Sequence, residues 1–278
     1  MTKTAIVTGA SAGIGEATAL ALQAKGFTVY AVARRADRMK HLAARGIVPV
    51  SADVTDDPSL VALVDKVIAE TDRVDVLVNN AGYGSYGALE EVPMDEARRQ
   101  FDVNVFGLAR LTQLVLPHMR TQGSGRIINV SSIGGRIWEP LGAWYHATKF
   151  AVEGLSDSLR AELRPHGIDV VVIQPGAIRT EWAGISADNL RAASTIPAYA
   201  EQVRIGAAVL KKADEVKAAS PPETVAKTIA RAATAKRPKT RYATGGGARS
   251  VLLFNRLLTD RGWDRAITAA YKSQARGT

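Results

Sequence analysis

Short runs of β-branched and other apolar residues alternate along the chain with longer segments rich in alanine, leucine and charged residues. Apolar runs bounded by turn residues are typical of strands buried on both faces, which form parallel sheets covered by helices. We therefore expect an α/β fold with a doubly wound, mainly parallel sheet of the Rossmann type. The expected strands are 4–8, 28–33, 47–50, 74–79, 126–131 and 169–174, and the expected helices are 14–24, 38–45, 60–69, 94–119 and 144–163.

The alternation loosens between residues 180 and 220, where alanine and mixed-polarity residues surround scattered large apolar ones. Pro221-Pro222-Glu223 then predicts the start of a helix, because proline is tolerated in a first helical turn. We expect a last strand at 240–244 and terminal helices at 250–258 and 263–271. The chain has no visible internal repeat and no linker before residue 180, so a single domain over 1–278 is expected.

The composition is that of an ordinary globular protein, with 46% hydrophobic and 23% charged residues. The absence of cysteine excludes disulfides, thiolate chemistry and cysteine-rich zinc sites. No two of the four histidines have metal-ligand spacing, so no metal is expected. The first residues lack a signal peptide's basic flank and apolar run, and no stretch approaches the ~20 apolar residues that span a bilayer. A soluble, cytoplasmic protein is expected.

The net charge of +9 is concentrated near the C-terminus, where residues 211–278 hold 15 basic and 5 acidic side chains. Such an excess can attract an anionic membrane surface or a nucleic acid. It can also be a solvated face, which the scattering of these charges among helical residues favours. We therefore expect no nucleic-acid partner and treat peripheral membrane contact as the less favoured alternative.

A glycine-rich turn, Thr8-Gly9-Ala10-Ser11-Ala12-Gly13-Ile14-Gly15, separates the first expected strand from the first helix. Glycines let the backbone turn sharply and approach a pyrophosphate, while the helix N-terminus offers free N–H groups and a positive dipole end. The spacing Gly-x-x-x-Gly-x-Gly differs from the standard dinucleotide fingerprint. Its position after the first strand nevertheless indicates a dinucleotide site.

Arginine follows the second expected strand, which ends Val32-Ala33-Arg34-Arg35. An acidic residue there would bind the ribose 2′-hydroxyl of NAD, whereas arginine accommodates the 2′-phosphate of NADP. Surface arginines at a strand exit are the alternative interpretation. Arg34, with Arg35 as a weaker contributor, predicts NADP.

Two further segments follow expected strands. Asp53-Val54 either lines the adenine end of the site or forms a turn. Asn79-Asn80-Ala81-Gly82 either packs against a cofactor or is also a turn. Neither segment decides between these alternatives by itself.

Tyr145 and Lys149 lie four residues apart in the expected helix 144–163, hence on one face of it. A tyrosine titrates near ~10 and a neighbouring positive charge favours its ionised form, so Lys149 is expected to lower the pKa of Tyr145. Such a pair also occurs by chance on many helices. His146 would point about 100° away from Tyr145, and we expect no role for it.

Several motifs occur together in the order and spacing of one family. Thr8 to Gly15, Asn79 to Gly82, Asn104, Ser132, Tyr145, Lys149 and Pro175-Gly176 resemble the motif set of the short-chain dehydrogenase/reductase family. The resemblance is close over residues 3–180 and loose beyond. Residue 12 is alanine where some NADP-dependent members carry a basic side chain, which leaves the NADP argument mainly to Arg34.

The resemblance implies a reaction. Tyr145 would be the general acid for carbonyl reduction, or the base for alcohol oxidation. Lys149 would bind the nicotinamide ribose, and Ser132 would hold the substrate oxygen. Ser131 is the rival of Ser132, which is preferred because it lies thirteen residues before Tyr145. Asn104 would sit mid-helix and hold a water that passes protons towards Lys149.

The expected cofactor-binding positions combine these motifs with the residues after the sixth strand. They are Gly9, Ser11, Gly13, Ile14, Gly15, Arg34, Arg35, Asp53, Val54, Asn80, Ala81, Gly82, Tyr145, Lys149, Pro175, Gly176, Ile178 and Thr180.

Large apolar and aromatic residues are expected to line the substrate cavity. They are Tyr83, Tyr86, Ile133, Trp138, Leu141, Trp144, Trp182 and Ile185. The alternative for some of the tryptophans is a place in the core or in a subunit interface. We expect a hydrophobic ketone or aldehyde, or the corresponding alcohol, as substrate. The stretch 83–89 resembles the hydroxysteroid and retinol dehydrogenase-like branch, and the family resemblance implies a mobile substrate lid at 180–220.

Two implications concern partners. The helices 94–119 and 144–163 resemble those that pair in family dimers and tetramers, so a homodimer or homotetramer is expected. Family-like folds can also act as redox-sensing modules that bind NADP(H) and control a protein partner. The intact Asn104, Ser132, Tyr145 and Lys149 favour the enzyme.

Overall fold

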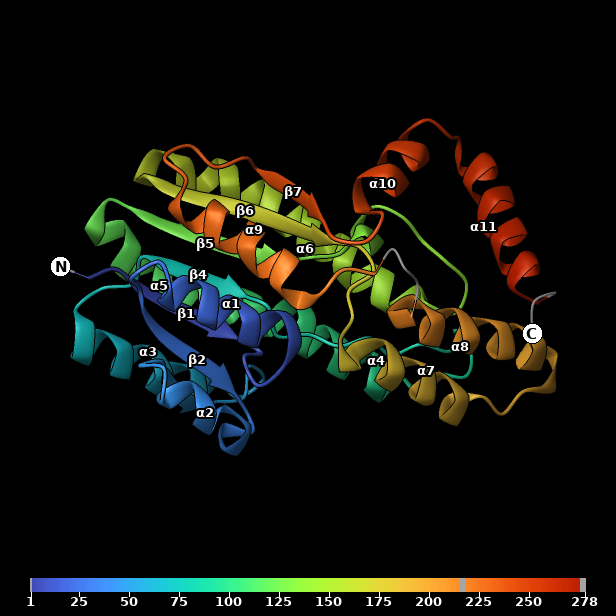
Figure 1. Ribbon diagram of the computed structural model, residues 1–278, viewed down its shortest axis with the longest axis horizontal. Helices are drawn as coiled ribbons and strands as arrows, with labels where there is room; N and C mark the ends of the chain where they lie inside the picture. The colour runs from blue at the N-terminus through green and yellow to red at the C-terminus, as the bar shows by residue number, and fades with distance from the viewer. Residues whose placement is uncertain (1, 216–218, 276–278) are drawn as a thin grey trace.

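Seven parallel strands form one sheet in a computed structural model that describes residues 2–215 and 219–275 (Figure 1). The strand order is β3-β2-β1-β4-β5-β6-β7. The predicted doubly wound parallel sheet is confirmed. The strands are β1 (Thr4–Thr8), β2 (Thr28–Ala33), β3 (Val48–Ser51), β4 (Val76–Asn79), β5 (Gly125–Val130), β6 (Ile168–Pro175) and β7 (Arg241–Thr244).

Helices cover both faces of the sheet because alternate strand residues point to opposite sides. One face packs against α1 (Gly13–Gln23), α2 (Lys40–Ala43) and α9 (Pro222–Thr234), and the other against α3 (Asp57–Thr71), α5 (Gly107–Gln122) and α6 (Ala143–Leu163). In β5, for example, Ile128 belongs to the first core and Ile127 to the second. Two apolar layers therefore hold the sheet rigid.

The strand order reverses between β1 and β4, which lie side by side with Val7 opposite Val78. In open parallel sheets a crevice forms beyond the carboxyl ends of the strands at this point. Four helices extend the molecule beyond this edge (Figure 1). They are α7 (Glu181–Ala193), α8 (Ala200–Glu215), α10 (Ala248–Arg256) and α11 (Asp260–Ala275).

The helix expected at 94–119 is divided in the structure. It begins as α4 (Met94–Phe101), widens into a π-helical turn at Asp102–Phe106 and continues as α5. Such single π-turns inside α-helices are frequent at functional sites. Asn104, expected mid-helix, lies in this turn with 2% of its surface exposed.

A buried ladder of polar side chains crosses the middle of the sheet. Asn79 Nδ2 donates to Asn129 Oδ1 at 2.9 Å and to Thr112 Oγ1 at 3.1 Å, and Asn129 Nδ2 donates to Ser156 Oγ at 2.9 Å. Asn129 is fully buried. The ladder fixes α5 and α6 to the ends of β4 and β5, because a buried polar group without a hydrogen-bond partner lowers the stability of the fold.

We predict that Asn129→Ala lowers the free energy of unfolding by about 2–3 kcal/mol, because two buried hydrogen bonds are lost and a cavity is left. Urea denaturation measures the change. The control is Asn189→Ala on the exposed face of α7, which should change stability by less than about 0.5 kcal/mol. Equal effects of the two substitutions would contradict the structural importance of the ladder.

Candidate active site

The glycine-rich turn forms a tight cradle between β1 and α1. Gly9 has φ +68°, and a Cβ on it would meet Asn80 Nδ2 at 2.8 Å. A Cβ on Gly15 would lie 2.2 Å from the carbonyl oxygen of Gly9. The N-cap residue of α1, Ala12, provides no side-chain cap. Free N–H groups and small residues at a helix start suit a phosphate-bearing ligand.

The fourth strand's exit is locked to this cradle. Thr8 Oγ1 accepts hydrogen bonds from the backbone N–H groups of Asn80 and Ala81, both at 3.0 Å. Asn80 Nδ2 donates to the carbonyl oxygen of Thr8 at 2.9 Å. A Cβ on Gly82 would lie 3.0 Å from Asn104 Oδ1 and 3.7 Å from Lys149 Nζ. The segment 80–82 thus connects the glycine turn to the Tyr145–Lys149 helix.

The residues after β2 and β3 differ in their surroundings. Arg34 and Arg35 are exposed at the end of β2. Asp53 Oδ1 accepts from Thr55 N at 2.9 Å and from Thr55 Oγ1 at 2.8 Å, an arrangement typical of a turn former. The carbonyl oxygen of Val54 would lie 2.5 Å from a Cβ on Gly107. Both alternatives named for Asp53 therefore stay open, since a turn former can also line a ligand site.

The segment after β6 contacts two other parts of the chain. Gly176 N donates to the carbonyl oxygen of Thr244 at 2.9 Å, directly after Pro175 ends the strand. Ile178 packs its side chain against Gly245, where an added Cβ would lie 2.3 Å away. Thr180 caps α7 and lies close to Gly13, 3.1 Å from a Cβ placed there. The sequence-predicted residues Gly13 and Thr180 are therefore brought together.

Ser132 and Tyr145 face each other. Burial raises the pKa of Tyr145 to about 12, a hydrogen bond with the Ser132 side chain lowers it, and the charge of Glu139 raises it. Ser132 Oγ also accepts from Gly134 N at 3.0 Å. Ser131 Oγ instead points towards Gly135, 2.6 Å from a Cβ placed there, and among the described residues has no hydrogen-bond partner. Of the two serines, Ser132 is the one at Tyr145.

Lys149 and Asn104 lie behind the phenol. Lys149 Nζ is 6.0 Å from the centre of the Tyr145 ring and donates to the carbonyl oxygen of Val130 at 3.0 Å. Asn104 Oδ1 accepts from Tyr83 N at 3.0 Å, and its Nδ2 donates to Tyr83 O at 2.9 Å and to Thr148 Oγ1 at 3.1 Å. Asn104 therefore fixes the loop after β4 to α6.

Comparisons with known proteins agree with this geometry. A family model described as short chain dehydrogenase matches residues 3–190. The uncharacterized oxidoreductase YusZ of Bacillus subtilis is 38% identical over 276 residues, which cover 95% of this chain and 97% of that protein. The chain belongs to the short-chain dehydrogenase family.

Solved structures of other family members support the assignment. A short-chain dehydrogenase from Streptomyces avermitilis is 36% identical, with a TM-score of 0.81 over 100% of this chain and 98% of that one. A metagenomic short-chain oxidoreductase in complex with NADP is 28% identical, with a TM-score of 0.68 over 86% and 95%. Another similar structure holds NAD.

The prediction that Lys149 lowers the pKa of Tyr145 is wrong for this short-chain dehydrogenase without a bound cofactor. We expected the pKa of Tyr145 to fall, but burial raises it to about 12. Burial also lowers the pKa of Lys149 to about 8, opposed by the charge of Glu153. Both groups are only 7% exposed, and a low-dielectric site disfavours the charged form of each.

An aromatic cluster covers the phenol. Trp182 lies 5.2 Å and Tyr86 5.6 Å from Tyr145, measured between ring centres, and Leu141 packs in the same apolar group. The expectation for the other wall residues is partly wrong. Trp144 packs on Phe101, Trp138 on Trp263, Tyr83 donates to Glu96, and Ile185 is 53% exposed.

His146, for which we expected no role, contacts the site. Its ring lies 5.6 Å from that of Tyr145 and is buried. Nε2 lies 3.2 Å from the N–H of Glu139, which can only donate, so Nδ1 carries the proton that is donated to Gly134 O at 2.9 Å. Although His146 is offset by about 100° from Tyr145 on the helix, the segment 134–139 folds back over its ring and connects it to the site.

Glu139 is the functional candidate that sequence reasoning missed. Tyr86 donates its hydroxyl to Glu139 Oε1 at 3.1 Å, and Tyr271 of α11 hydrogen-bonds the same carboxyl group. Burial raises the pKa of Glu139, while the hydrogen bonds from Tyr86 and Tyr271 lower it. The available signal was an acidic residue inside the apolar stretch 137–141.

Within the described ranges 2–215 and 219–275, no group of three or more histidine, cysteine, aspartate or glutamate side chains could hold a metal ion. No helix of that part of the chain is long and apolar enough to cross a bilayer.

We predict that Glu139→Gln lowers the pKa of Tyr145, because the ionised carboxylate disfavours a nearby phenolate. The measurement is tyrosinate absorbance across the alkaline range, with the signal of Tyr145 isolated by subtracting the Tyr145→Phe variant in each background. The expected decrease is about half a unit to one unit. An unchanged or raised pKa would contradict the influence of Glu139.

Proposed function

We propose that this short-chain dehydrogenase transfers a hydride between NADP(H) and a hydrophobic ketone or aldehyde, or the matching secondary or primary alcohol. The observation that carries the proposal is the hydroxyl pair of Ser132 and Tyr145 beside Lys149, at the edge of the sheet that also holds the glycine cradle. A bound nicotinamide supplies the hydride, and the protein supplies orientation and the proton.

The residues have distinct roles in this proposal. Tyr145, whose high pKa keeps it protonated at neutral pH, donates its proton to the carbonyl oxygen during reduction. Ser132 holds that oxygen through its hydroxyl. Lys149 binds the nicotinamide ribose as a cation. Asn104 orders the loop at Tyr83, and its part in a proton relay rests on the family resemblance.

The preference for NADP rests on Arg34. Its guanidinium is exposed at the end of β2, and its positive charge acts on the pKa of Tyr83 after the stronger effects of burial and Glu96. Arg34 thus lies within electrostatic range of Tyr83 in the loop after β4. A guanidinium there suits a 2′-phosphate.

We predict that Arg34→Asp reverses the nucleotide preference. Binding of NADPH should weaken by about 10- to 100-fold relative to NADH, because a charge-assisted contact is replaced by repulsion. Fluorescence titration with both nucleotides measures the ratio. The control is the neighbouring Arg35→Asp, which should change the ratio less, and an unchanged ratio in Arg34→Asp would rule out this basis for NADP.

The substrate proposal rests on the aromatic cluster over Tyr145. Trp182 belongs to α7, so the segment 180–220, of which residues 216–218 lie outside the described ranges, contributes to this cluster and is proposed as the lid. An ion pair of 3.2 Å between Arg38 Nη1 and Glu181 Oε2 joins the start of α7 to the segment after β2. An aromatic cluster beside the proton donor suits a hydroxysteroid- or retinol-type carbonyl, and this is the substrate class that we propose.

We predict that Tyr145→Phe and Ser132→Ala reduce carbonyl turnover, by about 10³-fold and about 10²-fold respectively. NADPH oxidation with a panel of bulky ketones and aldehydes measures the losses. Ser131→Ala is the matched control and should keep nearly full turnover. The alternative, a redox-sensing module, would still bind NADPH and control its protein partner in Tyr145→Phe. That alternative would be favoured if the wild type showed no carbonyl turnover and Tyr145→Phe still controlled the partner.

The remaining assignments concern the molecule's surroundings. Phe106 and Phe150, 59% and 43% exposed, support pairing through the helices 94–119 and 144–163 in a homodimer or homotetramer. The basic C-terminal region is proposed as a solvated face, with no nucleic-acid partner. We place the enzyme in the cytoplasm as part of the same proposal.

A further inference from the structure

One face of α6 carries a row of ionisable side chains behind the phenol. Tyr145, Lys149, Glu153 and Asp157 follow each other at intervals of four residues, so each lies one turn from the next. The first three residues are buried, with 7% exposure for Tyr145 and Lys149 and 3% for Glu153, whereas the side chain of Asp157 is 39% exposed. Glu153 is therefore the buried anion next to Lys149.

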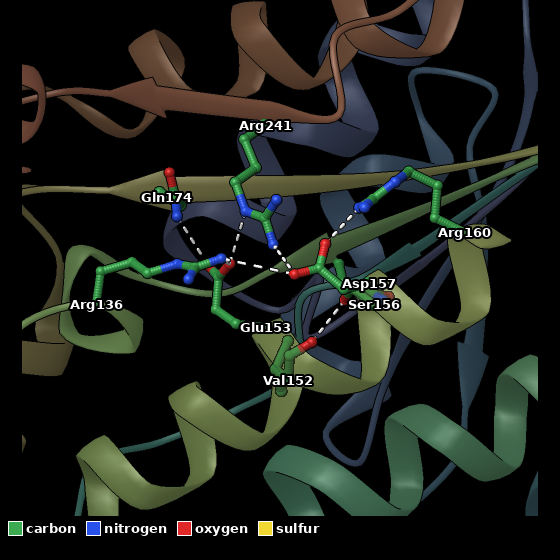
Figure 2. Close-up of polar contacts among 9 residues, drawn as sticks. Arg136, Val152, Glu153, Ser156, Asp157, Arg160, Gln174 and Arg241 are labelled. Carbon is green, nitrogen blue, oxygen red and sulfur yellow. Dashed lines mark hydrogen bonds and ion pairs between the residues drawn. The ribbon is translucent and has the colours of Figure 1, made fainter.

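Three elements converge on Glu153 (Figure 2). Its Oε2 accepts from Arg136 Nη2 at 3.0 Å and from Arg241 Nε of β7 at 2.9 Å. Its Oε1 accepts from Gln174 Nε2 of β6 at 2.9 Å. Arg241 Nη2 also donates to Asp157 at 2.6 Å. A buried carboxylate with three donors is fixed in place, because moving it would leave charges unpaired.

The packing of Gly135 against α6 positions the backbone of Lys149. A Cβ on Gly135 would lie 2.9 Å from both the carbonyl oxygen of Lys149 and Glu153 Cγ. The segment that follows Ser132 therefore packs directly on the turn of α6 that holds both residues. A displacement of Glu153 would therefore also move Lys149 and Ser132.

We infer that Glu153 is a positioning residue for Lys149. Its carboxylate holds the Lys149 turn of α6 in register and, as the anion one helical turn from Lys149, favours the charged form of the ammonium. The inference rests on the proposed function for its catalytic meaning, since a charged Lys149 is needed there to hold the nicotinamide ribose.

The charges around the two residues support this role. Glu153 is faced by Arg136 from the segment after β5, Arg241 from β7, neutral Gln174 from β6, and Asp157 and Lys149 of its own helix. The neutral side chains of Tyr145 and Asn104 are the further polar groups near Lys149. Without Glu153, the guanidinium groups of Arg136 and Arg241 would lose the buried carboxylate that they share one turn from Lys149. The charged form of Lys149 would lose the anion that favours it.

The test measures the protonation of Lys149 directly. Trace labelling of amines at a series of pH values, followed by peptide mass spectrometry, gives the pH at which Lys149 becomes reactive in the full-length protein. In the wild type this transition is expected near the pKa of about 8. Glu153→Gln should move it down by about one unit or more, so that near pH 8 the charged fraction falls several-fold.

The matched control variant is Arg136→Gln, which should shift the pH of the Lys149 transition in the opposite direction. Arg136 is 43% exposed, so its loss should be tolerated, and removal of a cation should move the Lys149 transition to higher pH. Asp157→Asn removes an anion that is more exposed and one turn farther away, and should give a smaller downward shift. General loosening of α6 cannot produce shifts of opposite sign.

A Glu153→Gln transition equal to that of the wild type, or shifts of the same sign in Glu153→Gln and Arg136→Gln, would overturn the inference. Titration with NADPH at the same pH values adds the functional consequence. Its affinity should fall with rising pH alongside the Lys149 transition of each variant. Failure of the wild type to bind NADPH at any pH would count against the proposed function, whereas the labelling result decides the role of Glu153 separately.

Discussion

The spacing of four residues along α6 is the constraint on which the site depends. It places a phenol, an amine and two carboxylates on one helix face, which runs from the aromatic cluster to a network of ion pairs. Because the helix is 21 residues long and packs on β6 along its length, these groups share one rigid support. A shift of the helix would move the whole set together.

Burial sets the charge states along this face. A phenol and an amine that leave water both favour their neutral forms, so the pKa of Tyr145 rises and that of Lys149 falls. Two carboxylates act on the pair from opposite ends. Glu139 makes the phenol still harder to ionise, while Glu153 helps the amine to stay charged. The protein alone therefore presents a proton donor next to a group that can carry a positive charge, which is the arrangement that the proposed carbonyl reduction uses.

The C-terminal helices contribute to the same site from a distance in sequence. Tyr271 of α11 hydrogen-bonds Glu139, and Trp263 Nε1 donates to Trp138 O at 2.9 Å. Arg241 of β7 reaches Glu153. Residues from Arg241 to Tyr271 thus hold the segment between Ser132 and Tyr145, directly at Trp138 and Glu139 and through Glu153 at Arg136. They lie outside residues 3–190, which the family model matches.

The sequence by itself determined the parallel sheet, the order of its strands and helices and the family, because apolar periodicity and glycine turns are local signals that directly reflect backbone geometry. It also predicted that Tyr145 and Lys149 lie on one face of a helix, because residues four apart are one helical turn from each other. Only the tertiary structure decided which serine faces Tyr145, that His146 and Glu139 reach the site, that Trp144 and Ile185 do not line the aromatic cluster, and that the pKa of Tyr145 rises. These outcomes depend on burial and on contacts between segments as far apart as Glu139 and Tyr271, and no local pattern in the chain encodes the dielectric environment that such contacts create.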